Sequence, residues 1–120
     1  MDASDNETKA LAADILYAAP CSIELPAGTG KTQLIASVAS LAGSFGRRTL
    51  ILTHTNAGVS VIKDRLRLFG INPSKYSVST ICAWAERVSH AYPLLSGIDT
   101  GINRSEPNYY TQCVLGAVKL

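Results

Sequence analysis

The stretch of sequence that decides the fold is Pro26-Ala27-Gly28-Thr29-Gly30-Lys31-Thr32. A short apolar run, Cys21–Leu25, precedes it. Behind it, apolar residues recur at helical spacing, with Leu34, Ile35, Val38, Leu41 and Ala42 on one face. A strand, a glycine-rich turn, a Lys-Thr pair and a helix, in this order, build a cradle for nucleotide phosphates. The stretch therefore predicts an α/β fold with a phosphate-binding loop.

Each part of this loop has a chemical role in holding phosphates. Glycines let the backbone turn tightly and bring its N–H groups close to an anion. The helix that follows adds N–H groups without intrahelical partners and the positive end of its dipole. Lys31 supplies a mobile charge for the β- and γ-phosphates, and Thr32 supplies a hydroxyl for Mg²⁺, so both are predicted to be catalytic. The predicted cofactor-binding residues are Ala27, Gly28, Thr29, Gly30, Lys31, Thr32 and Gln33.

The full pattern G-x-x-x-x-G-K-[ST] is not met, because Leu25 stands at the place of its first glycine. The alternative interpretation is a glycine-rich turn that caps a helix, with Lys31 simply exposed to solvent. The expected strand and helix on either side of the loop favour phosphate binding.

The composition fits one soluble globular domain, because 120 residues, 47% of them hydrophobic and 17% charged, are too apolar for a disordered tail. Acidic residues predominate up to Gly30 and basic residues after it. The basic part after Gly30 could bind nucleic acid, and the alternative is that its charges only form a solvated surface. Three unclustered cysteines, Cys21, Cys82 and Cys113, indicate reduced thiols and a cytoplasmic protein. No apolar stretch is long enough to span a membrane.

Periodicity along the chain predicts strands that alternate with helices, which favours a parallel sheet. The expected strands are Cys21–Leu25, Thr49–Thr53 and Tyr76–Ser79. The first two expected helices are Lys9–Ala18 and the segment from the loop to Ala42, and a third starts at Ala57 and buries Val59, Ile62, Leu66 and Phe69. A fourth lies around Ile81, Trp84, Ala85 and Val88, and a last helix buries Tyr110, Cys113, Val114, Ala117 and Val118. Thr49–Thr53 is almost continuously apolar, as a strand buried on both faces would be. Residues 1–8 are polar and are expected to be disordered.

Small polar clusters follow the second and third predicted strands. They read Thr53-His54-Thr55-Asn56 and Ser79-Thr80-Ile81-Cys82-Ala83-Trp84. Open α/β sheets bind ligands at the carboxyl ends of their strands. Hydroxyl, amide and helix N-terminal N–H groups can hold backbone phosphates, and His54 and Trp84 could stack on unpaired bases. The alternatives are that Asn56 and Thr80 are helix N-caps and that Trp84 belongs to the core.

Together, the three motifs resemble those of the UvrD/Rep-like superfamily 1 helicases, in the same order and at the same spacing. The first motif of that family reads A-x-x-G-x-G-K-T, so the missing first glycine is normal there, and Leu25 takes the place of its alanine. The second commonly reads T-F-T-N-x-A-A-x-x-M, and His54 replaces its phenylalanine. The third commonly reads T-x-H-S-F, and Cys82 and Trp84 replace its histidine and phenylalanine. The resemblance covers about residues 22–92.

The resemblance implies that residues 1–120 form the N-terminal part of one RecA-like P-loop domain, a parallel sheet flanked by helices without its later strands. Lys31 and Thr32 would serve ATP and Mg²⁺, with Thr32 as the metal contact. The residues that would lie along a single-stranded DNA track are His54, Thr55, Asn56, Thr80 and Trp84. The chain would then be the ATP- and single-stranded-DNA-binding segment of an ATP-dependent DNA helicase.

ATP hydrolysis also needs an acid for Mg²⁺ and a group that orients water. In this family both come from an apolar strand that ends in Asp-Glu, and no such strand follows Trp84. We therefore expect no hydrolysis by this chain alone, and we expect the remainder of the motor or a complementing chain as a partner, besides DNA. Unpaired strand edges would make the isolated chain marginally stable. Two alternatives stay open: a nucleotide-responsive regulatory module without turnover, and a small P-loop kinase with Arg104 in a lid.

Overall fold

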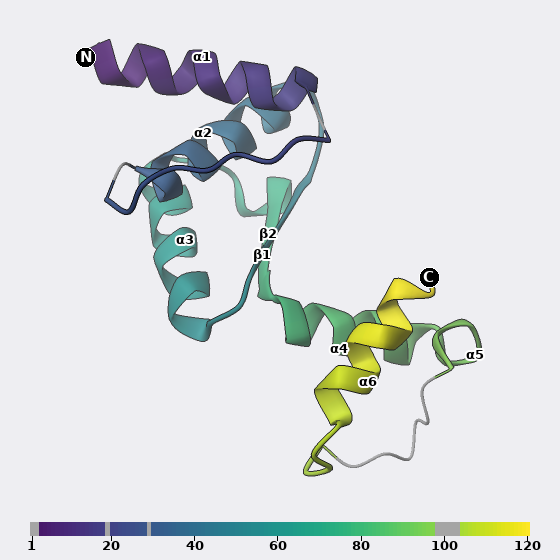
Figure 1. The fold of residues 1–120 in the computed structure, drawn as a ribbon. Coiled ribbons are helices and arrows are strands. Elements are labelled where there is room, and N and C mark those ends of the chain that lie inside the picture. The colour runs from purple at the N-terminus through teal and green to yellow at the C-terminus, as the bar shows by residue number, and fades with distance from the viewer. Residues whose placement is uncertain (1–2, 19, 29, 98–103) are drawn as a thin grey trace. The chain divides into compact units, whose positions relative to one another are not determined.

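The computed structural model describes residues 3–18, 20–28, 30–97 and 104–120 (Figure 1). In chain order the elements are α1 (Ala3–Ala18), α2 (Lys31–Ser44), β1 (Thr49–Thr53), α3 (Asn56–Leu68), the 3₁₀ turn η1 (Pro73–Lys75), β2 (Tyr76–Thr80), α4 (Ile81–Ala91), α5 (Pro93–Ser96) and α6 (Tyr109–Val118). β1 and β2 pair in a two-stranded parallel sheet. The predicted α/β class, with a parallel sheet flanked by helices, is confirmed.

The chain divides into two compact units. The first comprises Met1–Ile51 and Ser60–Val78, and the second comprises Leu52–Val59 and Ser79–Leu120. The first unit thus contains α1, α2 and most of α3, and the second contains α4, α5 and α6 together with the turn from β1 into α3. The predicted phosphate loop belongs to the first unit, and the two polar clusters after the strands belong to the second.

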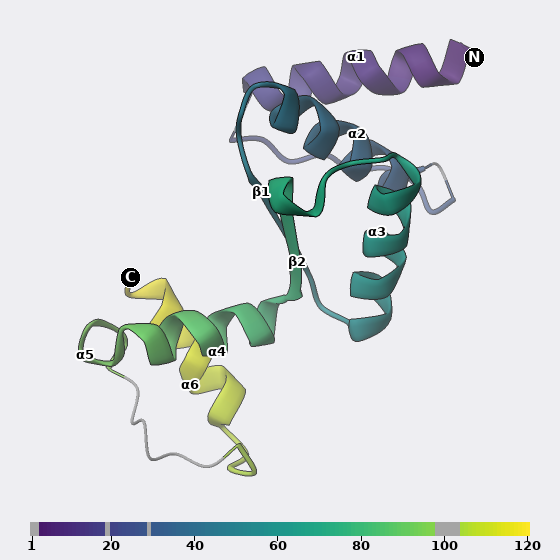
Figure 2. The same cartoon turned by 180° about the vertical axis from the view of Figure 1, so that it is seen from behind.

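The core of the first unit is built on small residues of α2. Ala36 and Ala39 are buried against Ile51 of β1, Tyr76 of β2, and the α3 residues Ile62 and Leu66. Alanine side chains allow neighbouring backbones to approach closely, and α2 packs both on α1 and on this core (Figure 2). The sequence correctly places Ile62 and Leu66 inside, whereas Phe69 remains 40% exposed.

β1 is buried on one face only, which corrects the expectation of burial on both faces. Ile51 is buried against the α2 and α3 core, whereas Leu50 and Leu52 on the opposite face are 47% and 38% exposed. Alternate residues of a strand point to opposite faces of the sheet, so helices on one side bury every second residue only. An apolar run in sequence therefore overstated how much of the strand is covered.

Cys21–Leu25 is not a strand, which is a second correction. The segment runs without regular structure, and its residues are exposed except for the half-buried Leu25. A strand needs a hydrogen-bonded neighbour, and the two strands that form pair with each other. The apolar pattern was right for a strand, but no partner strand from the described part of the chain lies along it.

α1 begins at Ala3 rather than at Lys9, so residues 3–8, expected to be disordered, continue the helix. Residues 1–2 lie outside the described part of the chain. The helical spacing of apolar residues predicts Leu11 and Ile15 inside, whereas Leu11 is 36% exposed and Ala12 is buried instead. Small residues of α1 thus meet the small residues of α2. None of the described helices is both long and apolar enough to cross a membrane.

The second unit packs α6 against α4 and α5. Its core holds Ala85 of α4 with Tyr109, Cys113 and Ala117 of α6. Gly116 allows this close approach, because a Cβ there would lie 3.0 Å from Ser89 Oγ and 3.1 Å from the carbonyl oxygen of Ser96. Cys113 and Ala117 are buried and Val114 packs against this core, as predicted. Tyr110 and Val118, also predicted to be inside, are 44% and 79% exposed.

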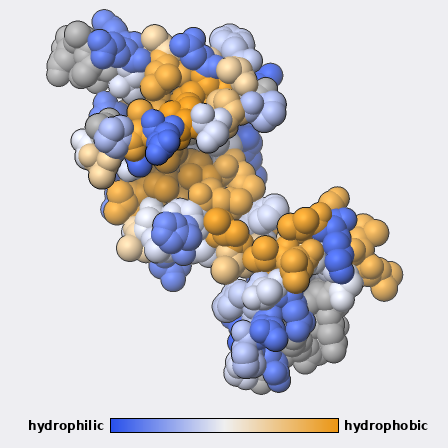
Figure 3. All heavy atoms as spheres, in the orientation of Figure 1, coloured by the Kyte–Doolittle hydropathy of each residue, from blue (hydrophilic) through white to orange (hydrophobic). Residues whose placement is uncertain are grey.

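Buried hydroxyl groups join the helices of the second unit. Ser89 Oγ donates to the carbonyl of Cys113 at 2.6 Å, and Ser96 Oγ donates to the carbonyl of Ser89 at 2.9 Å. Around this buried core the unit keeps an apolar surface, visible in orange over α5 and α6 in Figure 3. Its exposed apolar residues include Leu94, Leu95, Leu115 and Val118. The residues from Leu94 to Asn108 are rich in turn-forming types and predict no helix, whereas α5 forms over Pro93–Ser96.

Candidate nucleotide and nucleic-acid sites

The glycine-rich loop holds two glycines in the left-handed conformation. The φ angle is +80° at Gly28 and +87° at Gly30, with Thr29 between them outside the described residues. Residues with a Cβ rarely adopt such angles. At either glycine, no atom of the described residues other than the adjoining ones lies within 4 Å of the position that a Cβ would take. The backbone angle alone therefore requires glycine here, and the space beside both residues is open.

α2 starts directly after this turn, as the sequence predicts. The first helical hydrogen bond runs from the N–H of Leu34 to the carbonyl of Gly30, at 3.0 Å. Gly30 offers no side chain to cap the helix, and the first turn contains no acidic residue. The positive end of the helix dipole is thus not neutralised by a carboxylate of its own first turn, which suits an anionic ligand.

The side chains of the loop leave its cationic group accessible. Lys31 is exposed and forms no ion pair with any residue that the structure describes. Thr32 and Gln33 are half-buried on the first turn, and Ala27 is exposed in the turn before Gly28. The predicted cofactor residues are therefore contiguous in space around the start of α2, except for Thr29, which is not described.

The first polar cluster caps the start of α3. Thr55 Oγ1 accepts a hydrogen bond from the N–H of Gly58 at 3.0 Å, which is the contact of an N-cap residue. Thr55 rather than Asn56 is thus the cap, and Asn56 is the exposed first residue of the helix. A Cβ on Gly58 would lie 2.8 Å from Thr53 Oγ1. The end of β1 and the start of α3 therefore meet too closely for a side chain.

The second polar cluster caps the start of α4. Thr80 Oγ1 accepts from the N–H of Ala83 at 3.1 Å, so the capping alternative for Thr80 is confirmed. Because β1 and β2 are parallel, Thr80 and the residues after β1 follow the same edge of the sheet. His54 is exposed at that edge.

Trp84 packs against the core of the second unit. It is half-buried beside Ala85, Tyr109, Cys113 and Ala117, so the core interpretation of this side chain is confirmed. A half-buried indole can still present part of its ring. Of the five predicted DNA-track residues, two are thus also helix caps and one is also a core residue.

Glu86 of α4, two residues after Trp84, is engaged by an arginine. Arg104 donates to Glu86 Oε1 through both Nε, at 2.8 Å, and Nη2. The hydrogen bond with Glu86 raises the pKa of the Arg104 guanidinium above its ordinary value. The described residues contain no cluster of three or more His, Cys, Asp or Glu side chains that could hold a metal ion. Sequence reasoning missed this ion pair, because nothing in the local pattern links a helix residue to a distant loop residue.

Burial raises the pKa of two further groups beside this ion pair. Burial raises the pKa of the Tyr109 phenol, and a hydrogen bond from Arg104 opposes that shift. Burial likewise raises the pKa of the Cys113 thiol. Tyr109 Oη also lies 3.0 Å from His90 Nε2. These polar contacts join α4 to α6 and the loop before it.

Comparisons of the chain with protein-family models, with curated proteins and with solved structures give no match.

Proposed function

We propose that this chain is the nucleotide- and single-stranded-DNA-binding segment of an ATP-dependent DNA helicase with a RecA-like P-loop domain. The observation that carries the proposal is the geometry of the loop. Two left-handed glycines precede a helix that starts at Lys31, and no carboxylate of the first turn neutralises that start. This combination suits a bound phosphate group better than a simple capping turn, because a capping turn needs neither the second glycine nor the exposed lysine.

The residues present fit Mg-ATP as the ligand. The open space beside Gly28 and Gly30 would allow phosphates to approach the backbone, and the exposed Lys31 can reach them. The Thr32 hydroxyl would contact Mg²⁺, whose role when bound is to neutralise phosphate charge. The chain's own residues bind and orient the triphosphate.

The second part of the proposal concerns single-stranded DNA. His54 and Asn56 are exposed at the edge where the parallel strands end, and Thr55 and Thr80 begin the helices there. Starts of helices attract phosphates, and an exposed imidazole can stack on a base. The capping roles of both threonines keep these helix starts in place, so a structural role and a contact role are compatible.

We propose binding rather than hydrolysis as the activity of this chain. The Glu86 carboxylate is held by Arg104, so it is not available to orient water. This observation also favours the second candidate function, a nucleotide-responsive module without turnover. The same ion pair argues against a kinase lid built on Arg104.

The test is the affinity of the chain for Mg-ATP, measured by titration with a fluorescent ATP analogue. Lys31→Ala should lower the affinity at least about tenfold, because one charge-assisted phosphate contact contributes about 1.5–3 kcal/mol. Lys63→Ala, which removes an exposed lysine from α3, serves as the control and should bind normally. Equal affinities for the two variants would exclude the phosphate-loop assignment. Release of phosphate from ATP by the isolated chain would contradict binding without hydrolysis.

A further inference from the structure

The ends of α1 and α2 carry an exposed pair of aromatic side chains. Tyr17 near the end of α1 is 76% exposed, and Phe45, directly after α2, is 54% exposed. Their rings meet edge to face, with centroids 6.4 Å apart and an interplanar angle of 66°. Aromatic side chains usually lie inside a protein or in a binding surface, so a pair left this open suggests a ligand.

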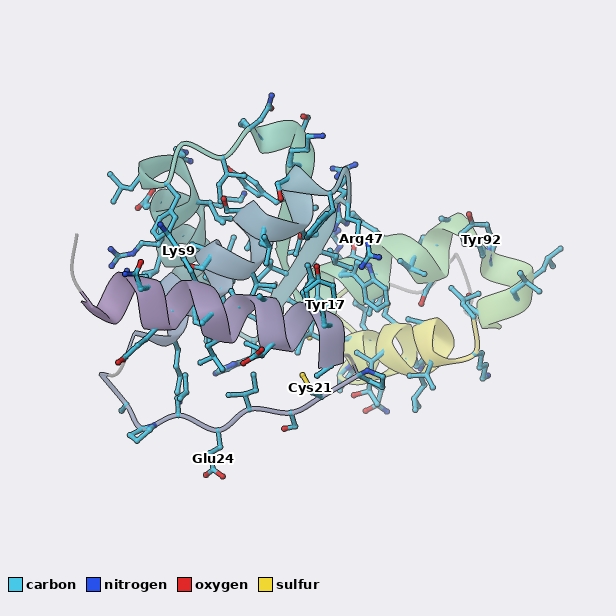
Figure 4. The ribbon with its side chains drawn as sticks, turned by 90° about the horizontal axis from the view of Figure 1, so that it is seen from above. Lys9, Tyr17, Cys21, Glu24, Arg47 and Tyr92 are labelled. Atoms are coloured by element: carbon cyan, nitrogen blue, oxygen red, sulfur yellow. The ribbon has the colours of Figure 1, made fainter. Side chains whose placement is uncertain are left out.

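Arginine stands beside this aromatic pair. Leu16, Tyr17, Phe45 and Arg47 line one hollow of about 450 Å³. Figure 4 shows Tyr17 at the end of α1 with Arg47 next to it. Hollows of this size accommodate small organic groups. All four residues belong to the first compact unit, so their arrangement is defined within it.

The charge of this surface is available to a ligand. Arg47 and Arg48 are both exposed, and neither forms an ion pair with any residue in the described part of the chain. One carboxylate, that of Asp14, lies one helical turn before Tyr17 on α1. The Arg47 guanidinium beside two aromatic rings matches a ligand that combines flat rings with negative charge.

We propose that Tyr17, Phe45 and Arg47 form a platform that binds an unpaired nucleotide of single-stranded DNA. A base stacks on the exposed rings, and Arg47 and Arg48 pair with the neighbouring phosphates. Unpaired strands expose base faces, which base pairs stacked in a duplex do not, so the aromatic pair selects single strands. The platform lies apart in sequence from His54, Thr55, Asn56, Thr80 and Trp84, and it extends the proposed function by a second DNA contact that needs no ATP.

The platform is tested by binding of the full chain to a fluorescein-labelled oligothymidylate, followed by fluorescence anisotropy without nucleotide. Tyr17→Ala and Phe45→Ala should each weaken binding by about 5- to 150-fold, as expected for the loss of one stacked base. Arg47→Gln should reduce the slope of log affinity against log salt by about 0.7, the value for one phosphate contact with a single strand.

Matched controls separate the platform from general effects. Tyr92→Ala removes another exposed tyrosine, and Arg65→Gln removes another exposed charge of the first unit. Both should bind the oligonucleotide normally. Normal binding by Tyr17→Ala and Phe45→Ala would overturn the proposal. Thymidine monophosphate that competes as well as the oligonucleotide would identify a free-nucleotide pocket and would overturn it too.

Two further measurements keep the result independent of folding and of the ATP site. An oligonucleotide with 5-iodouracil should cross-link to Tyr17 or Phe45 in the unmodified chain, and cross-links confined to other residues would contradict the platform. Tyr17→Ala should bind Mg-ATP normally, and Lys31→Ala should bind the oligonucleotide normally. The platform and the phosphate loop can therefore fail separately.

Discussion

Gly30→Ala tests the phosphate loop at the position where backbone geometry, rather than side-chain chemistry, is decisive. Gly30 has φ +87° and ψ 32°, and apart from the adjoining residues no described atom lies within 4 Å of the position of a Cβ. The substitution therefore creates no clash beyond the adjoining residues. Its entire effect is the cost of holding an L-residue in the left-handed conformation, or of leaving that conformation.

The magnitude follows from that cost. An L-residue in the left-handed region is less stable by about 1–2 kcal/mol. Alanine also has less conformational freedom than glycine in the unfolded chain, which stabilises the folded state by about 0.4–1 kcal/mol. The net change in the free energy of unfolding is thus small, at most about 1.5 kcal/mol. If the introduced alanine relaxes out of the left-handed region, ATP must restore that conformation, and the affinity falls by about 5- to 30-fold.

The assay compares Gly30→Ala with Gly70→Ala, a control with the same backbone demand. Gly70 has φ +71° and likewise no described atom within 4 Å of a Cβ position, but it follows α3 rather than the loop. Thermal melts should show similar small losses of stability for the two variants. Titration with a fluorescent ATP analogue should show weaker binding for Gly30→Ala alone. Similar ATP affinities for the two variants would refute the role of the loop.

Two other predictions follow from the second unit. Thr80→Asp should keep the cap on the N–H of Ala83, and thus the melting temperature, because aspartate caps helices at least as well as threonine. It should also weaken binding to an oligothymidylate by about five-fold, since a like charge about 4 Å from a phosphate costs about 1 kcal/mol in water. Unchanged binding of the oligothymidylate would mean that Thr80 caps the helix and does not contact DNA. The pKa values of the Tyr109 phenol and the Cys113 thiol are raised in the folded chain, so both groups stabilise it at lower pH. The free energy of unfolding should therefore fall as the pH rises above about 9. Denaturant titrations should show that this free energy falls less steeply with pH in Cys113→Ala than in the unmodified chain. The same fall in both proteins would exclude the thiol as a cause.

Local patterns predicted most of the regular structure. The spacing of apolar residues identified α2, α3 and α4, and the strands β1 and β2, because these signals lie within one element. The glycines of the loop were also predictable, since the left-handed conformation depends mainly on the residue itself. The cap of α3 was predicted wrongly as Asn56, because the neighbouring Thr55 is an equally suitable cap and its Oγ1 accepts from the N–H of Gly58.

The sequence by itself determined the elements whose hydrogen bonds close within a short segment, and the loop whose conformation only glycine tolerates. Tertiary structure alone decided whether Cys21–Leu25 became a strand, which face of β1 was buried, and that Glu86 met Arg104. The physical reason is the range of the contacts. A helix satisfies its own backbone, whereas a strand, a buried face and an ion pair each need a partner that another part of the chain brings to them.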